Sequence, residues 1–112
     1  MAYDQQLAHR VRAMFADNPT VREQTMFGAR AFLLTGRIAV AARANGGLMV
    51  RVDPADAAQL VKTPGAQLMT MKGRTMRGWI HVDAQHLRSA RALGNWIAIG
   101  AEAALHAHGM NP

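Results

Sequence analysis

Arginine is the residue type in this sequence with the clearest capacity for binding chemistry. Eleven of the 13 Lys and Arg residues are Arg, and only seven Asp and Glu oppose them, which leaves a formal charge of +6. A guanidinium binds phosphate or carboxylate groups through two parallel hydrogen bonds and stacks on aromatic rings. The charge is therefore compatible with an acidic partner, with nucleic acid, or with a plain role in solubility.

Five arginines and one tryptophan form the candidate binding surface. The candidate residues are Arg30, Arg43, Arg51, Arg74, Arg77 and Trp79. The first three arginines occupy neighbouring strands of one predicted sheet, and the other two flank a later hairpin that carries the tryptophan. We predict that this surface binds a protein partner. The structural alternative is that Trp79 belongs to the core and that Arg51 pairs with a helix carboxylate.

Direct binding of nucleic acid by the same arginines is the alternative function. Guanidinium groups contact phosphates, and an indole ring can stack on a base. Aromatic residues make up only 5% of the chain, however, and the paired sheet aromatics typical of RNA-binding domains are missing from the sequence. A protein partner is therefore the first hypothesis.

Reactive groups for catalysis are scarce in this sequence, so we expect a protein that is not an enzyme. There is no cysteine, which excludes thiol nucleophiles, thiolate metal sites and disulfides. Ser89 is the one serine, and it is placed where a helix needs a cap. Asp4, Asp53 and Asp83 stand at helix starts or strand exits, where capping explains them. No catalytic residues are predicted.

The five histidines do not predict a metal site. His106 and His108 are two residues apart, whereas helical ligands are three or four apart on one face. His81 and His86 could converge, but they lack Cys or a nearby acid as a further ligand. The glycines at residues 36 and 73 are single turn glycines rather than a phosphate-binding loop. We expect neither a metal nor a cofactor.

Hydrophobic periodicity predicts the first half of the fold. Apolar residues recur with helical spacing over residues 4–16, and Asp4 is placed to cap this helix. From residue 21 to 52 the period changes to two, which predicts an antiparallel meander of three or four strands. Thr35 and Asn45 each precede a glycine in its tight turns.

The second half returns to helical spacing twice. Residues 54–61 are predicted to be a helix because Asp53 is placed as its cap and Pro54 at its first position. Residues 68–71 are predicted to be a short strand and residues 76–82 a longer one. A final helix begins after the cap at Ser89 and continues to Gly109.

This order of elements predicts an α+β fold with one domain over residues 1–112. An antiparallel β-meander sheet of about four to six strands is covered by the N-terminal and C-terminal helices. Within it, residues 25–40 are predicted to be an architectural hairpin with a possible binding face, in which Phe32 and Leu34 pack against helices or a partner and Arg30 and Arg37 mark exposed faces or edges.

Several short motifs occur in the order seen in one bacterial family. They are M-F-G at 26–28, A-F-L at 31–33, L-M-V-R-V at 48–52, P-G-A at 64–66 and G-R-T-M-R-G-W at 73–79. Together they resemble the N-terminal domain of the TfoX/Sxy family, over nearly the whole chain from Tyr3 to Ala104. The sequence therefore resembles a TfoX N-terminal domain that stands alone.

The resemblance implies a small α+β domain from bacteria without established catalytic residues. The best-known members regulate natural competence alongside a transcription factor, which implies a role in transcription regulation. Those members carry a further C-terminal domain that this sequence does not show. A second departure is Ala29, where the family often has another glycine.

The sequence also gives expectations for the cellular location and the oligomeric state of the protein. The first ten residues include Asp4 and no apolar run, so they do not resemble a secretory signal. No run of about 18 apolar residues predicts a membrane span. We therefore expect a cytoplasmic protein that does not enter the membrane. A small sheet leaves edge strands that can pair with a second copy, so we also expect a homodimer.

Overall fold

The computed structural model describes residues 3–107 of the chain. It contains six strands, namely β1 (Arg22–Met26), β2 (Ala29–Leu34), β3 (Arg37–Ala42), β4 (Leu48–Arg51), β5 (Ala66–Met71) and β6 (Arg74–Val82). The helices of the described part are α1 (Gln5–Met14), α2 (Ala57–Leu60) and α3 (Ala90–Ala107), with 3₁₀ turns η1 (Pro54–Asp56) and η2 (Ala84–Leu87). The predicted end of the last helix at Gly109 lies outside the described residues.

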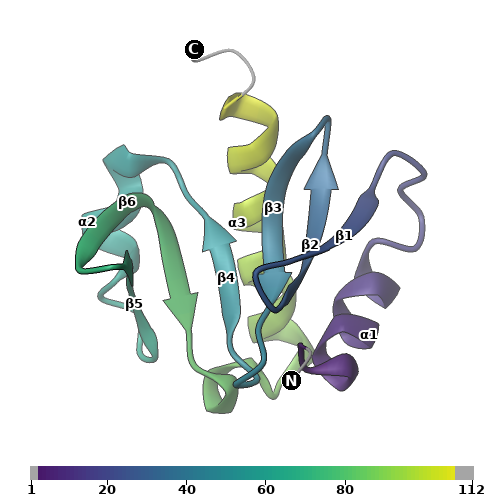
Figure 1. Ribbon diagram of the computed structural model, residues 1–112, viewed down its shortest axis with the longest axis horizontal. Coiled ribbons are helices and arrows are strands. Elements are labelled where there is room, and N and C mark those ends of the chain that lie inside the picture. The colour runs from purple at the N-terminus through teal and green to yellow at the C-terminus, as the bar shows by residue number, and fades with distance from the viewer. Residues whose placement is uncertain (1–2, 108–112) are drawn as a thin grey trace.

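The six strands form one antiparallel sheet in the order β1-β2-β3-β4-β6-β5. The first four follow chain order, so they form the predicted meander. The chain then passes through η1 and α2 and returns as β5 at the far edge, outside β6 (Figure 1). The predicted α+β fold, with an antiparallel sheet covered by the first and last helices, is confirmed.

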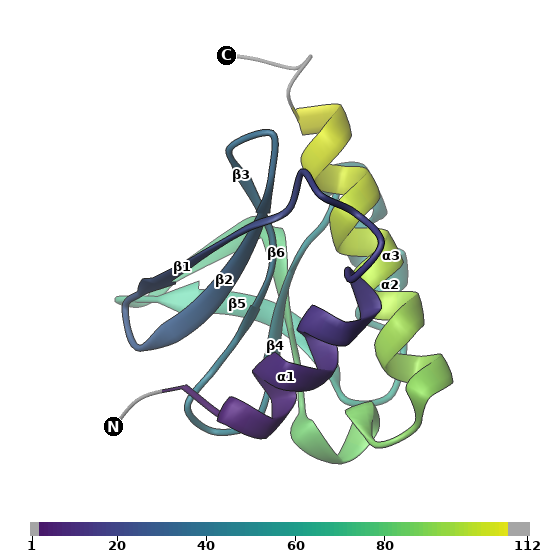
Figure 2. The same ribbon diagram turned by 90° about the vertical axis from the view of Figure 1, so that its right-hand side faces the viewer.

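The helices lie on one side of the sheet, as Figure 2 shows for α1 and α3. The outer strands at both edges curl away from these helices. The face turned away from α1 and α3 is called the open sheet face below. Within residues 3–107, no helix is long and apolar enough to cross a membrane.

The predicted caps Asp4 and Ser89 are confirmed, whereas Asp83, also predicted to cap, makes no side-chain hydrogen bond at the start of η2. The Asp4 carboxylate accepts a hydrogen bond of 2.9 Å from the backbone N–H of Leu7 at the start of α1. The Ser89 hydroxyl accepts one of 3.0 Å from the N–H of Ala92 at the start of α3. Each satisfies a backbone donor that has no partner inside the helix.

Asp53 also accepts a hydrogen bond, from the N–H of Ala55 at 2.9 Å. The segment it caps is shorter than predicted, because residues 54–61 form one 3₁₀ turn followed by one α-helical turn. A second 3₁₀ turn, η2, was not predicted; its Leu87 is only 1% exposed and completes the core.

Three hairpins of the sheet are closed by the same two-residue turn. The first residue is Phe27, Thr35 or Lys72, with φ of 51°, 51° and 53°, and the second is a glycine with φ of 75°, 81° and 79°. Positive φ at both positions defines the turn that matches the twist of an antiparallel hairpin. Each X-Gly pair therefore sets the register next to its turn, and irregularities further along shift it in the β2–β3 and β5–β6 hairpins.

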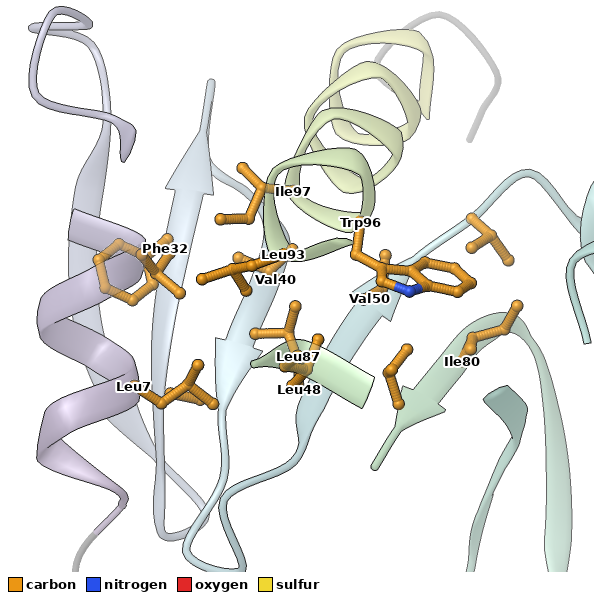
Figure 3. Packing of buried hydrophobic residues seen from close by; sticks show 14 of the residues in the cluster. Leu7, Phe32, Val40, Leu48, Val50, Ile80, Leu87, Leu93, Trp96 and Ile97 are labelled. Atoms are coloured by element: carbon orange, nitrogen blue, oxygen red, sulfur yellow. The ribbon is translucent and has the colours of Figure 1, made fainter. Parts of the chain in front are cut away.

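The core lies between the helix-facing side of the sheet and the helices α1 and α3 (Figure 3). Side chains from every layer meet there, including Leu7 of α1, Leu93, Trp96 and Ile97 of α3, and Phe32, Val40, Leu48, Val50 and Ile80 of the sheet. All of these are at most 5% exposed. The strand alternation places these residues on the helix side and their neighbours on the open sheet face.

Candidate functional site

The open sheet face carries three of the residues that the sequence singled out, namely Arg43, Arg51 and Trp79. Val50 and Ile80 point into the core, so their neighbours Arg51, Trp79 and His81 point to the other side. The floor between them is apolar and includes Ala41, which is only 1% exposed although neither α1 nor α3 covers this face. The face is thus a curved apolar floor with basic groups at both of its ends.

Arg51 and Trp79 form a fixed pair at one end of this face. They are directly opposite each other on β4 and β6, and the guanidinium carbon lies 4.4 Å from the centre of the indole. The Nε–H of Arg51 donates a hydrogen bond of 2.6 Å to the carbonyl of Ile38. The ring and the carbonyl together hold the guanidinium in one orientation.

The structural alternative for this pair is wrong in both parts. Trp79 is half-buried and lies outside the core cluster, whose tryptophan is Trp96. No carboxylate of residues 3–107 lies within 4.0 Å of the Arg51 guanidinium. Burial lowers the pKa of Arg51, and the nearby charge of Arg37 lowers it further.

Arg43 lies at the opposite end of the open sheet face, beside a buried histidine. Its Nη1 is 2.9 Å from Nδ1 of His81 and 3.7 Å from the sulfur of Met69. The other ring nitrogen of His81 lies 3.3 Å from a carboxylate oxygen of Asp83. Burial lowers the pKa of His81, and the Arg43 charge adds to this effect despite the opposing carboxylate. Both effects disfavour the charged form of the ring, so the fixed positive charge at this end is that of Arg43.

Arg30 does not belong to this surface. It points to the helix side of the sheet, where its Nε lies 3.0 Å from the carboxylate of Glu23, and its Nη1 donates to Thr25 at 2.7 Å. Arg12 of α1 lies 2.6 Å from the same carboxylate. Arg30 is thus half-buried and neutralised, which corrects the prediction that it marks an exposed face.

The Glu23 carboxylate should make the stability of the domain depend on pH. Hydrogen bonds from Arg12 lower the pKa of Glu23 below its ordinary value, despite a smaller opposing effect of burial. A lowered folded-state pKa stabilises the fold above the unfolded-state pKa, and this stability is lost as the pH falls through the folded-state pKa. We therefore expect the free energy of unfolding to decrease below about pH 5.

Urea titrations of the wild type and Glu23→Gln between pH 7 and pH 3 test this expectation. The variant should be less stable at pH 7, and the difference from the wild type should shrink towards pH 3. Thr25→Val, which leaves the carboxylate in place, serves as the control and should keep the wild-type pH dependence. A constant difference across the whole range would contradict the assignment.

Arg74 and Arg77 lie on the β5–β6 hairpin, and both are exposed. Arg74 pairs with Met71, whereas Arg77 lies in the irregular stretch of β6 at which its pairing with β5 shifts register. No hydrogen bond or ion pair within the described residues involves either guanidinium. These two arginines therefore form an exposed basic rim.

Two residues with functional potential were not recognised in the sequence. Arg37, predicted to be exposed, is half-buried at the start of β3, and its Nε–H has no hydrogen-bond partner within the described chain. Phe27 is 95% exposed at the tip of the β1–β2 hairpin. The Phe27 signal was present, because an aromatic residue stood where the equivalent turns have Thr35 and Lys72.

The histidines of the described residues do not form a metal site. Within residues 3–107, no group of three or more His, Cys, Asp or Glu is arranged to hold a metal ion. The polar contacts of His81 go to Arg43 and Asp83, whereas His86 lies beside Gln85. His106 is at the exposed end of α3, and His108 lies outside the described residues.

Comparison with known families gives a match to the TfoX N-terminal domain over residues 13–104, which is most of the chain. The chain belongs to this family. Ala29, where TfoX N-terminal domains often have another glycine, begins β2 and does not have positive φ, so the alanine is not strained there.

Two solved structures share the fold of this TfoX N-terminal domain. A Deinococcus radiodurans protein with the family domain DUF419 has a TM-score of 0.66 at 16% identity, covering 93% of this chain and 81% of that one. A Pseudomonas syringae protein has a TM-score of 0.59 at 13% identity, covering 86% of this chain and 93% of that one. No curated protein matched the sequence significantly.

Proposed function

We propose that this TfoX N-terminal domain is a noncatalytic regulatory module that binds a protein partner through its open sheet face. The observation that carries the proposal is the Arg51–Trp79 pair, a guanidinium held 4.4 Å from an indole with no carboxylate of residues 3–107 within 4.0 Å. Arginine and tryptophan are the residue types that most often dominate the binding energy of protein interfaces.

The surroundings of this pair support a protein partner. Apolar floor residues lie beside half-buried cations, which is the combination of an apolar centre and a polar rim found in interfaces. The exposed ring of Phe27 adds a second anchor, since a 95% exposed aromatic ring gains free energy when a partner buries it. Residues with an acidic character on the partner would complement Arg43, Arg51 and the rim residues Arg74 and Arg77.

The noncatalytic part of the proposal rests on how the reactive side chains are used. The Ser89 hydroxyl caps α3, and the His81 ring lies between Arg43 and Asp83. Because the family includes regulators that work alongside a transcription factor, the proposed partner is a cytoplasmic regulatory protein of that kind. A homodimer that pairs edge strands β1 or β5 would leave the open sheet face available.

Quantitative affinity capture from a native bacterial lysate tests the proposal. The wild type, Arg51→Ala and Trp79→Ala are compared with Arg91→Ala, which removes an exposed arginine of α3 instead. Loss of an interface residue that dominates binding should lower capture of the partner by about tenfold or more. Arg91→Ala should behave like the wild type. Equal recovery of every protein by all four baits would contradict the proposed surface.

Nucleic acid is the second candidate, because Arg51 over Trp79 also offers a cation and a ring for a phosphate and a base. Fluorescence anisotropy with single-stranded and double-stranded oligonucleotides over a salt series distinguishes the two. Phosphate contacts would give an affinity that falls steeply as salt rises. Under the protein-partner proposal, binding at physiological salt should be absent or should not change in Arg51→Ala.

A further inference from the structure

Strand β5 forms one edge of the sheet, and its outer side is unpaired within the described chain. Figure 1 shows β5 at the edge opposite β1, and Figure 2 shows that the outer strands curl away from α1 and α3. Neither long helix therefore covers this edge. An unpaired strand edge presents a row of backbone N–H and C=O groups with which a further strand can pair.

The register of β5 with β6 shows which backbone groups of β5 point outward. The N–H of Asp83 donates to the carbonyl of Gly65 at 3.0 Å, so Gly65 faces β6. Because bonded and non-bonded pairs alternate along an antiparallel ladder, Ala66 and Leu68 point outward. The Ala66 N–H already donates to the carbonyl of Thr63 at 3.1 Å. Leu68 is therefore the first residue of the strand whose N–H and C=O are both available within the described chain.

Thr70 points outward by the same reasoning from the other end of the strand. Met71 and Arg74 face each other across the two-residue turn and form the bonded pair that closes the hairpin. Thr70, one residue earlier, therefore directs its N–H and C=O away from β6. Leu68 and Thr70 thus present donors and acceptors at two positions about 7 Å apart along the edge.

The irregularity of the β5–β6 ladder does not interrupt this outer side. Leu68 is opposite Ile80 and the next residue, Met69, is opposite Met76, so the unpaired residues 77–79 belong to β6. Bulges often protect a sheet edge by twisting the edge strand itself away. Here the extra residues lie in the inner strand of the pair, and β5 is continuous over its whole length.

The side chains of β5 also leave this edge unprotected. None of residues 66–71 is charged and none is proline, although charged residues and proline are the usual means of preventing edge strands from pairing. The opposite edge, β1, begins with Arg22 and Glu23, and the Glu23 carboxylate lies 2.6 Å from Arg12 of α1. Met71 of β5 is 46% exposed, so an added strand would cover apolar surface there.

We propose that two copies of this chain pair through β5, antiparallel about a two-fold axis at Met69, so that their sheets join into one. In this register the N–H and C=O of Leu68 in one copy bond to the C=O and N–H of Thr70 in the other, and the symmetry repeats both bonds. The uncharged strands meet without like charges in contact. Lys72 of one copy comes to the start of β5 in the other, beside the half-exposed Asp83, so opposite charges approach each other at both ends.

Sedimentation velocity of the full chain over a concentration series tests the pairing. The wild type should show a monomer–dimer equilibrium. Thr70→Pro removes an outward N–H without a bond to β6, and Thr70→Lys brings like charges together near the axis; each should raise the dissociation constant of the dimer at least tenfold. Thr25→Pro is the matched control, because Thr25 also precedes the closing pair of its hairpin, Met26 with Ala29. It should dimerise like the wild type, and circular dichroism checks that each variant is folded.

Amide hydrogen exchange of ¹⁵N-labelled protein identifies the strand in the interface. The amides of Leu68 and Thr70 should exchange at least tenfold more slowly where the dimer dominates than in dilute solution, and the amide of Thr25 should not change. A monomer at every concentration, or a dimer that protects Thr25 instead, would overturn the pairing. Protection of Leu68 and Thr70 only after a captured protein is added would mean that the edge takes a strand of that protein, which contradicts pairing with a second copy.

The β5 pairing can fail separately from the proposed partner binding, because the outer edge of β5 and the open sheet face use different groups. Arg51→Ala should dimerise like the wild type, and Thr70→Lys should still capture the partner. A wild type that stays monomeric while Arg51→Ala loses the partner would contradict the β5 pairing alone. A β5 dimer with equal capture by all baits would contradict the partner surface alone.

Discussion

Replacement of Gly100 by alanine is expected to lower the free energy of unfolding by about 2–3 kcal/mol. Gly100 lies in α3 where the helix crosses β3. A Cβ atom at this position would overlap the carbonyl oxygen of Ala39 and would lie only 2.7 Å from Cγ1 of Val40. Both neighbours belong to the sheet, so the helix would have to move away from the core.

The size of this effect follows from two opposing contributions. Alanine is favoured over glycine inside a helix by up to about 1 kcal/mol. Overpacking of a closed core costs about 1–3 kcal/mol and occasionally more, and the carbonyl of a central strand cannot rotate out of the way as a side chain can. The steric cost should therefore exceed the gain in helix propensity.

Gly94 on the same helix provides the matched control. A Cβ there would meet only the end of the Met14 side chain, with the sulfur at 3.7 Å, an ordinary contact with a flexible side chain. Gly94→Ala should therefore stabilise the domain by about 0.5–1 kcal/mol through helix propensity alone. Urea unfolding of both variants measures the difference. If Gly100→Ala were as stable as Gly94→Ala, α3 could not pack on β3 as closely as described.

Replacement of Phe32 by alanine is expected to destabilise the domain by about 3–5 kcal/mol. Phe32 is 1% exposed in the centre of β2, and its ring stacks on that of Phe15 with the two centroids 6.1 Å apart. Truncation would remove a large apolar surface and leave a cavity between the sheet and α1. For a domain of this size, such a loss is a large part of the total stability.

Phe27 provides the contrast within the same hairpin. It is 95% exposed, so Phe27→Ala should change the free energy of unfolding by less than about 0.5 kcal/mol. Thermal unfolding followed by circular dichroism compares the two variants. Similar melting temperatures for Phe27→Ala and Phe32→Ala would show that the hairpin does not divide into a buried strand and an exposed tip.

Local sequence rules anticipated some elements of the fold and missed others. The hairpins at residues 35 and 72 and the caps at Asp4 and Ser89 depend on residues a few positions apart, so their types were readable from the chain. The inward position of Phe32 followed from strict alternation with one buried face. Helix 54–61 was predicted too long, since Asp53 and Pro54 specify where a helix begins but not its length.

Which arginines belong to the candidate surface could be learned only from the tertiary structure. The sequence proposed Arg30, Arg43 and Arg51 as one group, but Glu23 removes Arg30 from it by an ion pair across β1 and β2. Which charges neutralise one another depends on distances between strands, and local patterns do not contain these distances.

The amino-acid sequence by itself determined the main helices and strands, the caps at Asp4, Asp53 and Ser89, the hairpin turns and the family of the protein. The tertiary structure alone decided that β5 lies outside β6, that Arg51 stacks on Trp79, and that Arg37 lacks an acceptor in the described chain. The physical reason is the distance along the chain over which each interaction acts. Backbone preferences and alternation act over a few residues, whereas strand order and charge pairing arise only when distant segments are packed together.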